Sequence, residues 1–201
     1  MKAVVCTELN KISVEDVRLD PPKAGEVRIK MAATGVCHSD LSATNGTIPL
    51  PLPLVLGHEG AGHVVEVGAG VQNVQVGDMV ILTFVPNCGV CFHCIRGEAH
   101  LCRAIPPTGR QADGTSRLHL GDQDLAAFSA LGCMAEEAVV PAISVVKVKS
   151  DVSPRVAALI GWGGAQAGRA ACQAGSGHGR IGDREVADAE SLLGEDLPAH
   201  A

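Results

Sequence analysis

Four cysteines lie close together in one short stretch of this 201-residue chain. They are Cys88, Cys91, Cys94 and Cys102, with the spacing C-x2-C-x2-C-x7-C. Two-residue gaps let a tight turn aim successive thiolates at one point, and a fourth thiolate closes a tetrahedron around a soft divalent ion. Because four protein ligands leave no open position, we expect a structural zinc here. Disulfides and free buried cysteines are the alternatives, and the spacing disfavours both.

A second signal is a cysteine and a histidine farther apart in the chain. Cys37 lies in the stretch G-V-C-H-S-D at residues 35–40, and His58 lies in G-H-E-G-A-G at residues 57–62. From spacing alone the pair means little, because cysteine is often a small core residue and histidine is often a hydrogen-bonding one. A shared metal site therefore needs further support.

The elements that position these side chains are predicted to be mainly strands. Short apolar stretches recur between Gly, Pro, Asn and Asp breakers, which is typical of a sandwich or barrel. Within them, residues 27–31 alternate apolar and polar side chains, as a half-buried strand does. Residues 106–124 are polar and irregular, and are predicted to form a long surface loop. The predicted strands are Ala3–Cys6, Val27–Ala33, His63–Val67, Met79–Phe84, Ala138–Pro141 and Val145–Val148.

A helix is predicted after these strands, and the composition changes where it ends. Ser153 suits the N-cap, Pro154 suits the first helical position, and Gly161 can end the helix. Residues 162–201 are rich in Gly, Ala, Arg, Asp and His, with few large apolar residues. We expect a disordered or poorly packed tail there, with one short helix over Asp183–Leu193.

Composition excludes several classes of protein. Hydrophobic content is 46%, enough for a sizeable core, and aromatic content is only 2%. The net charge of −6 and the scattered basic residues disfavour nucleic acid as a partner. No apolar run approaches the roughly 18 residues of a membrane span. The early polar residues disfavour a signal peptide, and eight cysteines without one favour reduced thiols and a cytoplasmic location.

Taken in chain order, the stretches at 35–40, 57–62 and 88–102 resemble the zinc-dependent alcohol dehydrogenases of the medium-chain dehydrogenase/reductase family. The resemblance covers residues 1–161. It implies the N-terminal catalytic domain of that family, which is an irregular GroES-like β-barrel with a structural zinc lobe and short helices.

The resemblance also implies a role for each residue of the second stretch. Cys37 and His58 correspond to ligands of a catalytic zinc, and Glu59 to the acidic neighbour that can approach it. Asp40 corresponds to the carboxylate that orients the ligand histidine. Ser39 corresponds to the hydroxyl that bonds the substrate alcohol and passes its proton onward.

For four further positions the resemblance implies a role less specifically. His38 matches a position where family members often have a basic residue near the cofactor phosphates, although a plain surface histidine is the alternative. Ser42 replaces the family's relay histidine, so proton exit through a histidine is not expected. Phe84 and Phe128 match pocket-lining positions, with ordinary core packing as the alternative.

The match ends at Trp162. The family has A-A-L-x-G-C here, with the cysteine as third ligand of the catalytic zinc, whereas residues 157–162 read A-A-L-I-G-W. Tryptophan offers no lone pair for zinc, so a weakened catalytic site is expected. A deleted base in a cysteine codon would explain both the tryptophan and the altered tail. The alternative reading frame of the gene must then encode a G-x-G-G-x-G sequence.

The resemblance implies an oxidoreductase that converts alcohols to aldehydes or ketones with NAD or NADP. In the family the cofactor is held by a Rossmann domain, which residues 162–201 do not resemble. Their loop Gly175–Gly179 lacks the required glycine spacing. We therefore expect the chain alone to be inactive, and the alternative is a non-catalytic zinc-binding remnant of the enzyme. The particular alcohol and the oligomeric state stay open.

Overall fold

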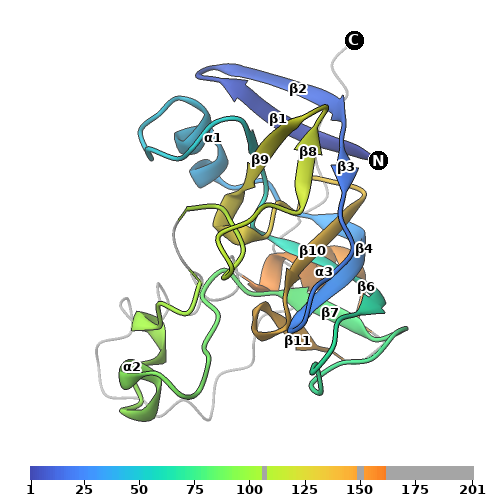
Figure 1. Ribbon diagram of the computed structural model, residues 1–201, viewed down its shortest axis with the longest axis vertical. Coiled ribbons are helices and arrows are strands. Elements are labelled where there is room, and N and C mark those ends of the chain that lie inside the picture. Colours follow the sequence, from blue (N-terminus) through green and yellow to red (C-terminus); the bar gives the residue numbers. More distant parts are fainter. Residues whose placement is uncertain (106–107, 149–151, 162–201) are drawn as a thin grey trace, which may run out of the picture. The chain divides into compact units, whose positions relative to one another are not determined.

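The computed structural model describes residues 1–105, 108–148 and 152–161, which belong to one compact unit, Met1–Ala165 (Figure 1). The unit is mainly β, as predicted, and consists of two curled sheets with short helices at its margins. The predicted tail at 162–201, with the helix Asp183–Leu193 and the loop Gly175–Gly179, lies outside the described residues. The predicted domain boundary at residue 161 therefore stays a prediction.

The first sheet has six strands in the order β2-β1-β5-β9-β8-β3. Its neighbours are antiparallel except for β5 and β9, which run parallel. Ala3, Val5, Val55 and Leu125 form the centre of its core. The strands are β1 (Lys2–Glu8), β2 (Lys11–Asp16), β3 (Arg18–Leu19), β5 (Leu54–Val55), β8 (Leu118–Leu120) and β9 (Gln123–Ala127).

The second sheet has five antiparallel strands in the order β10-β4-β6-β7-β11. The alternation predicted for β4 is confirmed, because Val27 and Ile29 are buried while Lys30 is exposed. Val80 and Leu82 of β7 pack into the same core. The strands are β4 (Glu26–Thr34), β6 (Gly60–Val67), β7 (Met79–Leu82), β10 (Glu137–Pro141) and β11 (Val145–Lys147).

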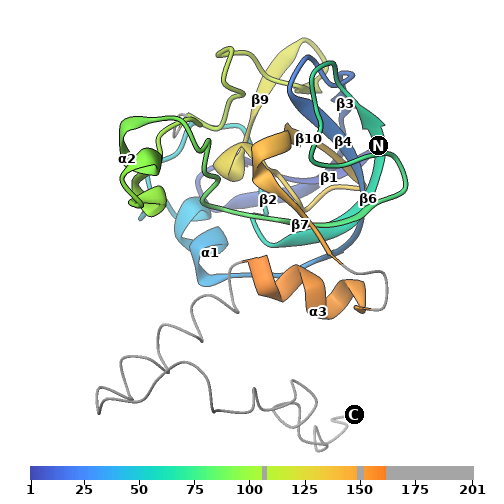
Figure 2. The same ribbon diagram turned by 90° about the horizontal axis from the view of Figure 1, so that it is seen from below.

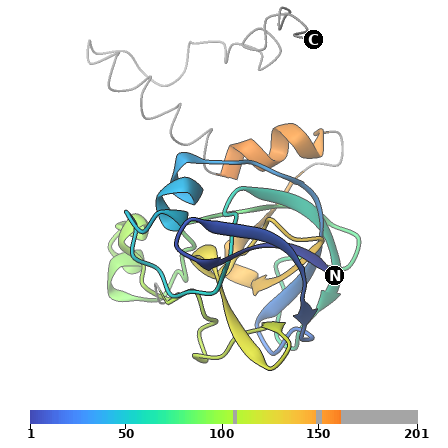
Figure 3. The same cartoon turned by 90° about the horizontal axis from the view of Figure 1, so that it is seen from above.

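Short helices complete the unit. The predicted helix is confirmed as α3 (Pro154–Leu159), which begins after the N-cap Ser153 and buries two alanines against β6 and β7. In Figures 2 and 3, α1 and α3 lie on the same side of the sheets. None of the helices in the described ranges is long and apolar enough to cross a membrane. The others are α1 (His38–Thr44), α2 (Phe92–Ile95), η1 (Ala99–Leu101), η2 (Phe128–Ala130) and η3 (Ala142–Ser144).

The predicted long surface loop over 106–124 is wrong in its second half. Strand β8 and the start of β9 fall inside that half, and Arg117 is buried there. Arg117 donates two hydrogen bonds to Glu26, at 2.8 and 2.6 Å, and a third to Asp113 at 3.0 Å. These ion pairs let a polar segment enter the protein, since buried charges are tolerated when they are paired and hydrogen-bonded.

Candidate metal centres

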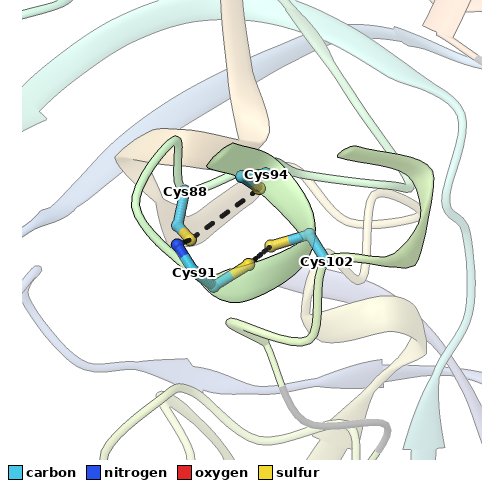
Figure 4. Close-up of side chains that lie close together, drawn as sticks. All are labelled: Cys88, Cys91, Cys94 and Cys102. Atoms are coloured by element: carbon cyan, nitrogen blue, oxygen red, sulfur yellow. Dashed lines mark hydrogen bonds between the residues drawn. The ribbon is translucent and has the colours of Figure 1, made fainter. Parts of the chain in front are cut away.

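The four cysteines of the predicted structural site converge on one point (Figure 4). We call residues 88–102 the cysteine lobe. The Sγ atoms of Cys88 and Cys94 lie 4.0 Å apart, and those of Cys91 and Cys102 lie 3.9 Å apart. A zinc with sulfur ligands at 2.3 Å in a tetrahedron places neighbouring sulfurs about 3.8 Å apart. The donor set and its spacing therefore fit a tetrahedral zinc, and the thiols are free rather than joined in disulfides.

Local backbone geometry aims these thiols. The amide of Cys91 donates to Cys88 Sγ at 3.3 Å, and α2 begins directly after Cys91. Gly89 has a φ of 72°, so the turn between the first two cysteines uses a conformation that favours glycine. Hydrogen bonds from the amides of Val90 and Cys91 lower the pKa of Cys88 to about 6. A thiol with a lowered pKa is readily available as the thiolate that binds metal.

The cysteine lobe packs little apolar surface of its own. Val90, Phe92 and Ile95 are exposed to 80%, 64% and 70%. No residue of the lobe belongs to a core cluster of the described part of the chain. The lobe therefore has no hydrophobic core of its own among the described residues, and a bound metal as the source of its stability stays a prediction.

The second constellation is also brought together by the fold. One ligand atom each from Cys37, His58 and Glu59 lies within 4.8 Å of the others. We call these three residues the buried centre, because His58 is 1% and Glu59 is 5% exposed. Cys37 is the N-cap of α1, while His58 and Glu59 lie just before β6. A cysteine, a histidine and a carboxylate form a donor set that zinc accepts.

Asp40 connects the two segments that carry this centre. Its Oδ2 accepts a hydrogen bond from the Cys37 amide at 3.0 Å, and its Oδ1 accepts one from the Gly57 amide at 3.0 Å. The same Oδ1 lies 3.5 Å from Nδ1 of His58. A histidine whose Nδ1 faces a carboxylate presents its Nε2 to a metal. Asp40 thus holds both segments, and its place beside Nδ1 suits the orienting role predicted for it, which stays a prediction.

The electrostatics follow from burial and from this carboxylate. Burial lowers the pKa of His58, but Asp40 and Cys37 together outweigh burial, so the pKa lies above its ordinary value. Burial raises the pKa of Cys37, but hydrogen bonds with Ser39 and the charge of His58 bring it below its ordinary value. Burial raises the pKa of Glu59. The Cys37 thiol is therefore more easily deprotonated, and the His58 ring more easily protonated, than the isolated side chains.

Two phenyl rings enclose His58. The ring centroid of Phe128 lies 4.6 Å from that of His58, with the planes tilted by 56°. Phe84 lies 5.6 Å away in an edge-on arrangement. Both phenylalanines predicted as pocket-lining residues therefore contact the predicted ligand. Phe128 is also packed in a core cluster with Cys6 and Leu54.

The remaining predicted residues lie on the first turn of α1. Ser39 Oγ is 3.5 Å from Cys37 Sγ, so the hydroxyl borders the buried centre. His38 is exposed, and its Nδ1 lies 3.3 Å from Ser42 Oγ. The geometry brings Ser39 to the centre but does not bring His38 into it, and the roles predicted for both residues stay predictions.

Sequence reasoning missed the residues that hold Glu59. The Thr34 hydroxyl and the Gly35 amide both donate to the Glu59 carbonyl oxygen, at 2.8 and 2.9 Å. A Cβ at Gly35 would lie 2.2 Å from Glu59 Oε2, so only glycine leaves room for this carboxylate. The only signal in the sequence was the glycine directly before Val36 and Cys37.

A family model and the similar proteins of known sequence all point to the same family. Residues 23–150 match the family described as the alcohol dehydrogenase GroES-like domain. The chain is 43% identical over 164 residues to the putative alcohol dehydrogenase D of Mycobacterium tuberculosis, covering 80% of this chain and 45% of the relative. It is 41% identical over 165 residues to the NDMA-dependent alcohol dehydrogenase of Amycolatopsis methanolica, covering 81% and 44%. The chain thus spans less than half the length of these relatives.

A solved structure supports the same assignment. The crystal structure of benzyl alcohol dehydrogenase from Acinetobacter calcoaceticus superposes with a TM-score of 0.75 at 32% sequence identity. The superposition covers 86% of this chain and 47% of that one. The predicted irregular GroES-like barrel is therefore confirmed by both sequence and structure.

Proposed function

Because the chain belongs to the alcohol dehydrogenase GroES-like domain family, we propose that it is the zinc-binding half of an oxidoreductase. The proposed reaction interconverts a small-molecule alcohol and its aldehyde or ketone, with NAD or NADP as hydride carrier. The observation that carries the proposal is the convergence of Cys37, His58 and Glu59 within 4.8 Å in a buried position. The cofactor is proposed for the whole enzyme, since the chain covers 45% of its Mycobacterium tuberculosis relative.

The two centres have different proposed tasks. Four thiolates make the cysteine lobe a closed structural site, whereas three donors leave the buried centre an open position. A zinc bound there would supply Lewis-acid polarisation of a substrate oxygen. With one thiolate instead of four, the buried centre is the weaker of the two sites.

The protein's own residues prepare that position. Cys37 and Glu59 supply negative charge, and Asp40 keeps the His58 ring in place. In the proposed scheme the Ser39 hydroxyl, beside Cys37, accepts a hydrogen bond from the alcohol and passes a proton onward to solvent as the alcohol loses its own. The phenyl rings of Phe84 and Phe128 exclude water from the His58 side and suit an apolar substituent on the substrate.

Cobalt substitution tests this proposal. Co²⁺ reports its ligands through visible absorption bands, so the two centres can be followed separately. We expect one tightly bound equivalent of Co²⁺, which Cys91→Ser removes, and one more weakly bound equivalent, which Cys37→Ser removes. Adding a primary alcohol should change only the spectrum of the weaker site, because the cysteine lobe has no open position. A cobalt spectrum that no alcohol alters would contradict the catalytic role.

A non-catalytic zinc-binding protein is the second candidate function. The complete four-cysteine cluster favours it, because that cluster alone is sufficient to bind zinc. Cobalt bound only at the cysteine lobe would support this candidate over the first.

A further inference from the structure

Two consecutive non-glycine residues adopt the left-handed backbone conformation directly after Phe128. Ser129 has φ 57° and ψ 28°, and Ala130 has φ 56°. Residues other than glycine rarely enter this region, because Cβ crowds the following carbonyl oxygen. Such strained residues persist only where their surroundings hold them, and they cluster at functional sites. We call residues 128–132 the Phe128 turn.

Both ends of the Phe128 turn are attached to the segment that leads into His58. Before the turn, residues 126–127 of β9 pair in parallel with residues 54–55 of β5. After the turn, the Cys133 amide donates to the Gly57 carbonyl oxygen at 3.0 Å. Gly57 directly precedes His58. The turn therefore spans a short gap between two fixed points on one segment, which leaves it little freedom.

Hydrogen bonds inside the turn fix the direction of its first residue. The Phe128 carbonyl oxygen accepts from the amides of Leu131 and Gly132, at 2.9 and 3.2 Å. This closure leaves the Phe128 ring against the His58 ring, at a centroid distance of 4.6 Å. Both side chains are buried, with exposed fractions of 5% and 1%.

We propose that the Phe128 turn is a positioning element that holds the Phe128 ring against His58 and so keeps the imidazole aimed at its ligand neighbours. Asp40 and Phe128 act on different motions of the ring. The Asp40 carboxylate, 3.5 Å from Nδ1, selects which nitrogen faces Cys37 and Glu59. The phenyl ring prevents the imidazole from tilting out of that direction.

Ordinary core packing is the competing explanation. Phe128 also contacts the cluster around Cys6 and Leu54, so a damaged turn lowers stability under either account. Only under the positioning account does damage to the turn also move the His58 ring. The part of the inference that concerns metal affinity rests on the proposed metal site at the buried centre.

Substitutions at matched strained positions separate the two accounts. Ala130→Val places a β-branched residue at a positive φ, where it is strongly disfavoured. Asn10→Val is the matched control, because Asn10 has a φ of 62° in the turn between β1 and β2. Ala130→Gly is the conservative variant, since glycine adopts this φ freely. Phe128→Leu removes the phenyl ring and shows the largest change expected at His58.

The readouts are the ring signals of His58 in NMR spectra of histidine-labelled protein and the affinity of the buried centre for Co²⁺. We expect Ala130→Val to move the His58 signals toward their positions in Phe128→Leu and to weaken cobalt binding about tenfold, as for other residues that orient metal ligands. Asn10→Val should lower the melting temperature without either change, and Ala130→Gly should match the wild-type protein.

Unchanged His58 signals in a destabilised Ala130→Val protein would overturn the inference, as would an equal movement in Asn10→Val. If Ala130→Val does not fold, Ser129→Thr provides the same comparison with a milder β-branched residue. If the wild-type protein binds no cobalt at the buried centre, the proposed catalytic function fails. The His58 signals still decide the role of the turn in that case, because they do not depend on metal.

Discussion

The cysteine lobe and the buried centre represent two ways to assemble a candidate metal site. All four lobe ligands lie within residues 88–102, on an exposed segment that local turns shape. The ligands of the buried centre come from separate segments, and a buried carboxylate, two phenyl rings and a close-packed glycine hold them. The lobe gathers its four thiols through local turns, whereas contacts between distant segments of the barrel gather the side chains of the buried centre.

The largest expected effect is on the cysteine lobe. Cys91→Ser removes one of four thiolates from a closed site, and structural zinc sites of this type contribute about 10–16 kcal/mol to folding. We expect loss of one stoichiometric zinc, measured by metal analysis after dialysis. Increased amide hydrogen exchange should be confined to the lobe. Exchange that also rises across the two sheets would contradict the independence of the two regions.

At the buried centre, Asp40→Asn should have the next largest effect. The substitution keeps the size of the side chain but removes the charge opposite His58 and one acceptor for the Cys37 or Gly57 amide. We expect cobalt affinity at this centre to fall about 10- to 100-fold, with the lobe unchanged. Asp16→Asn, at a carboxylate that is 77% exposed, is the control and should change neither site.

Trp162→Cys should raise the metal affinity of the buried centre toward that of the cysteine lobe. Residue 162 lies outside the described residues, but Gly161 before it packs closely enough that a Cβ would lie 2.3 Å from the Leu82 carbonyl oxygen. Leu82 ends β7, and Phe84 follows it and contacts His58. A thiolate added there should raise cobalt affinity at least about tenfold, equivalent to 1.4 kcal/mol. Trp162→Ser controls for the loss of the indole, and equal affinities in the two variants would exclude a ligand role.

The smallest expected effect compares one glycine from each region. Gly35→Ala places a Cβ against Glu59 and should displace its carboxylate, weakening cobalt binding at the buried centre by about 3- to 10-fold. Gly89→Ala strains a turn of the lobe but meets no atom within 4 Å, so the lobe should keep its zinc at a small cost in stability. Cobalt titration of both variants checks this pair. A larger metal loss in Gly89→Ala would reverse the comparison.

Several strands and the cysteine lobe could be predicted from the sequence because their signals are local. The alternation of β4 reflects burial of one face, and the helix start at Ser153 and Pro154 depends only on adjacent residues. Strands β2, β3, β5, β8 and β9 were not predicted. Leu54 and Val55 follow a proline-rich stretch, and they form a strand only because β1 and β9 lie on either side of them.

The wrongly predicted surface loop has a related cause. Arg117 is a polar residue in a polar segment, and nothing near it in the chain indicates burial. Its partner Glu26 is 91 residues away and is itself 7% exposed. A buried ion pair of this kind is visible only when both segments are in place, because each charge is tolerated inside only with the other.

By itself the sequence determined that the four cysteines of the lobe lie together as candidate ligands, since two-residue spacings restrict where neighbouring thiolates can point. It also specified, through its resemblance to a family, which residues to test at the buried centre. Only the tertiary structure decided that Asp40 holds two segments at once, that Gly35 makes room for Glu59, and that a strained turn keeps Phe128 on His58. These contacts join residues far apart in the chain, and their geometry depends on the closing of both sheets.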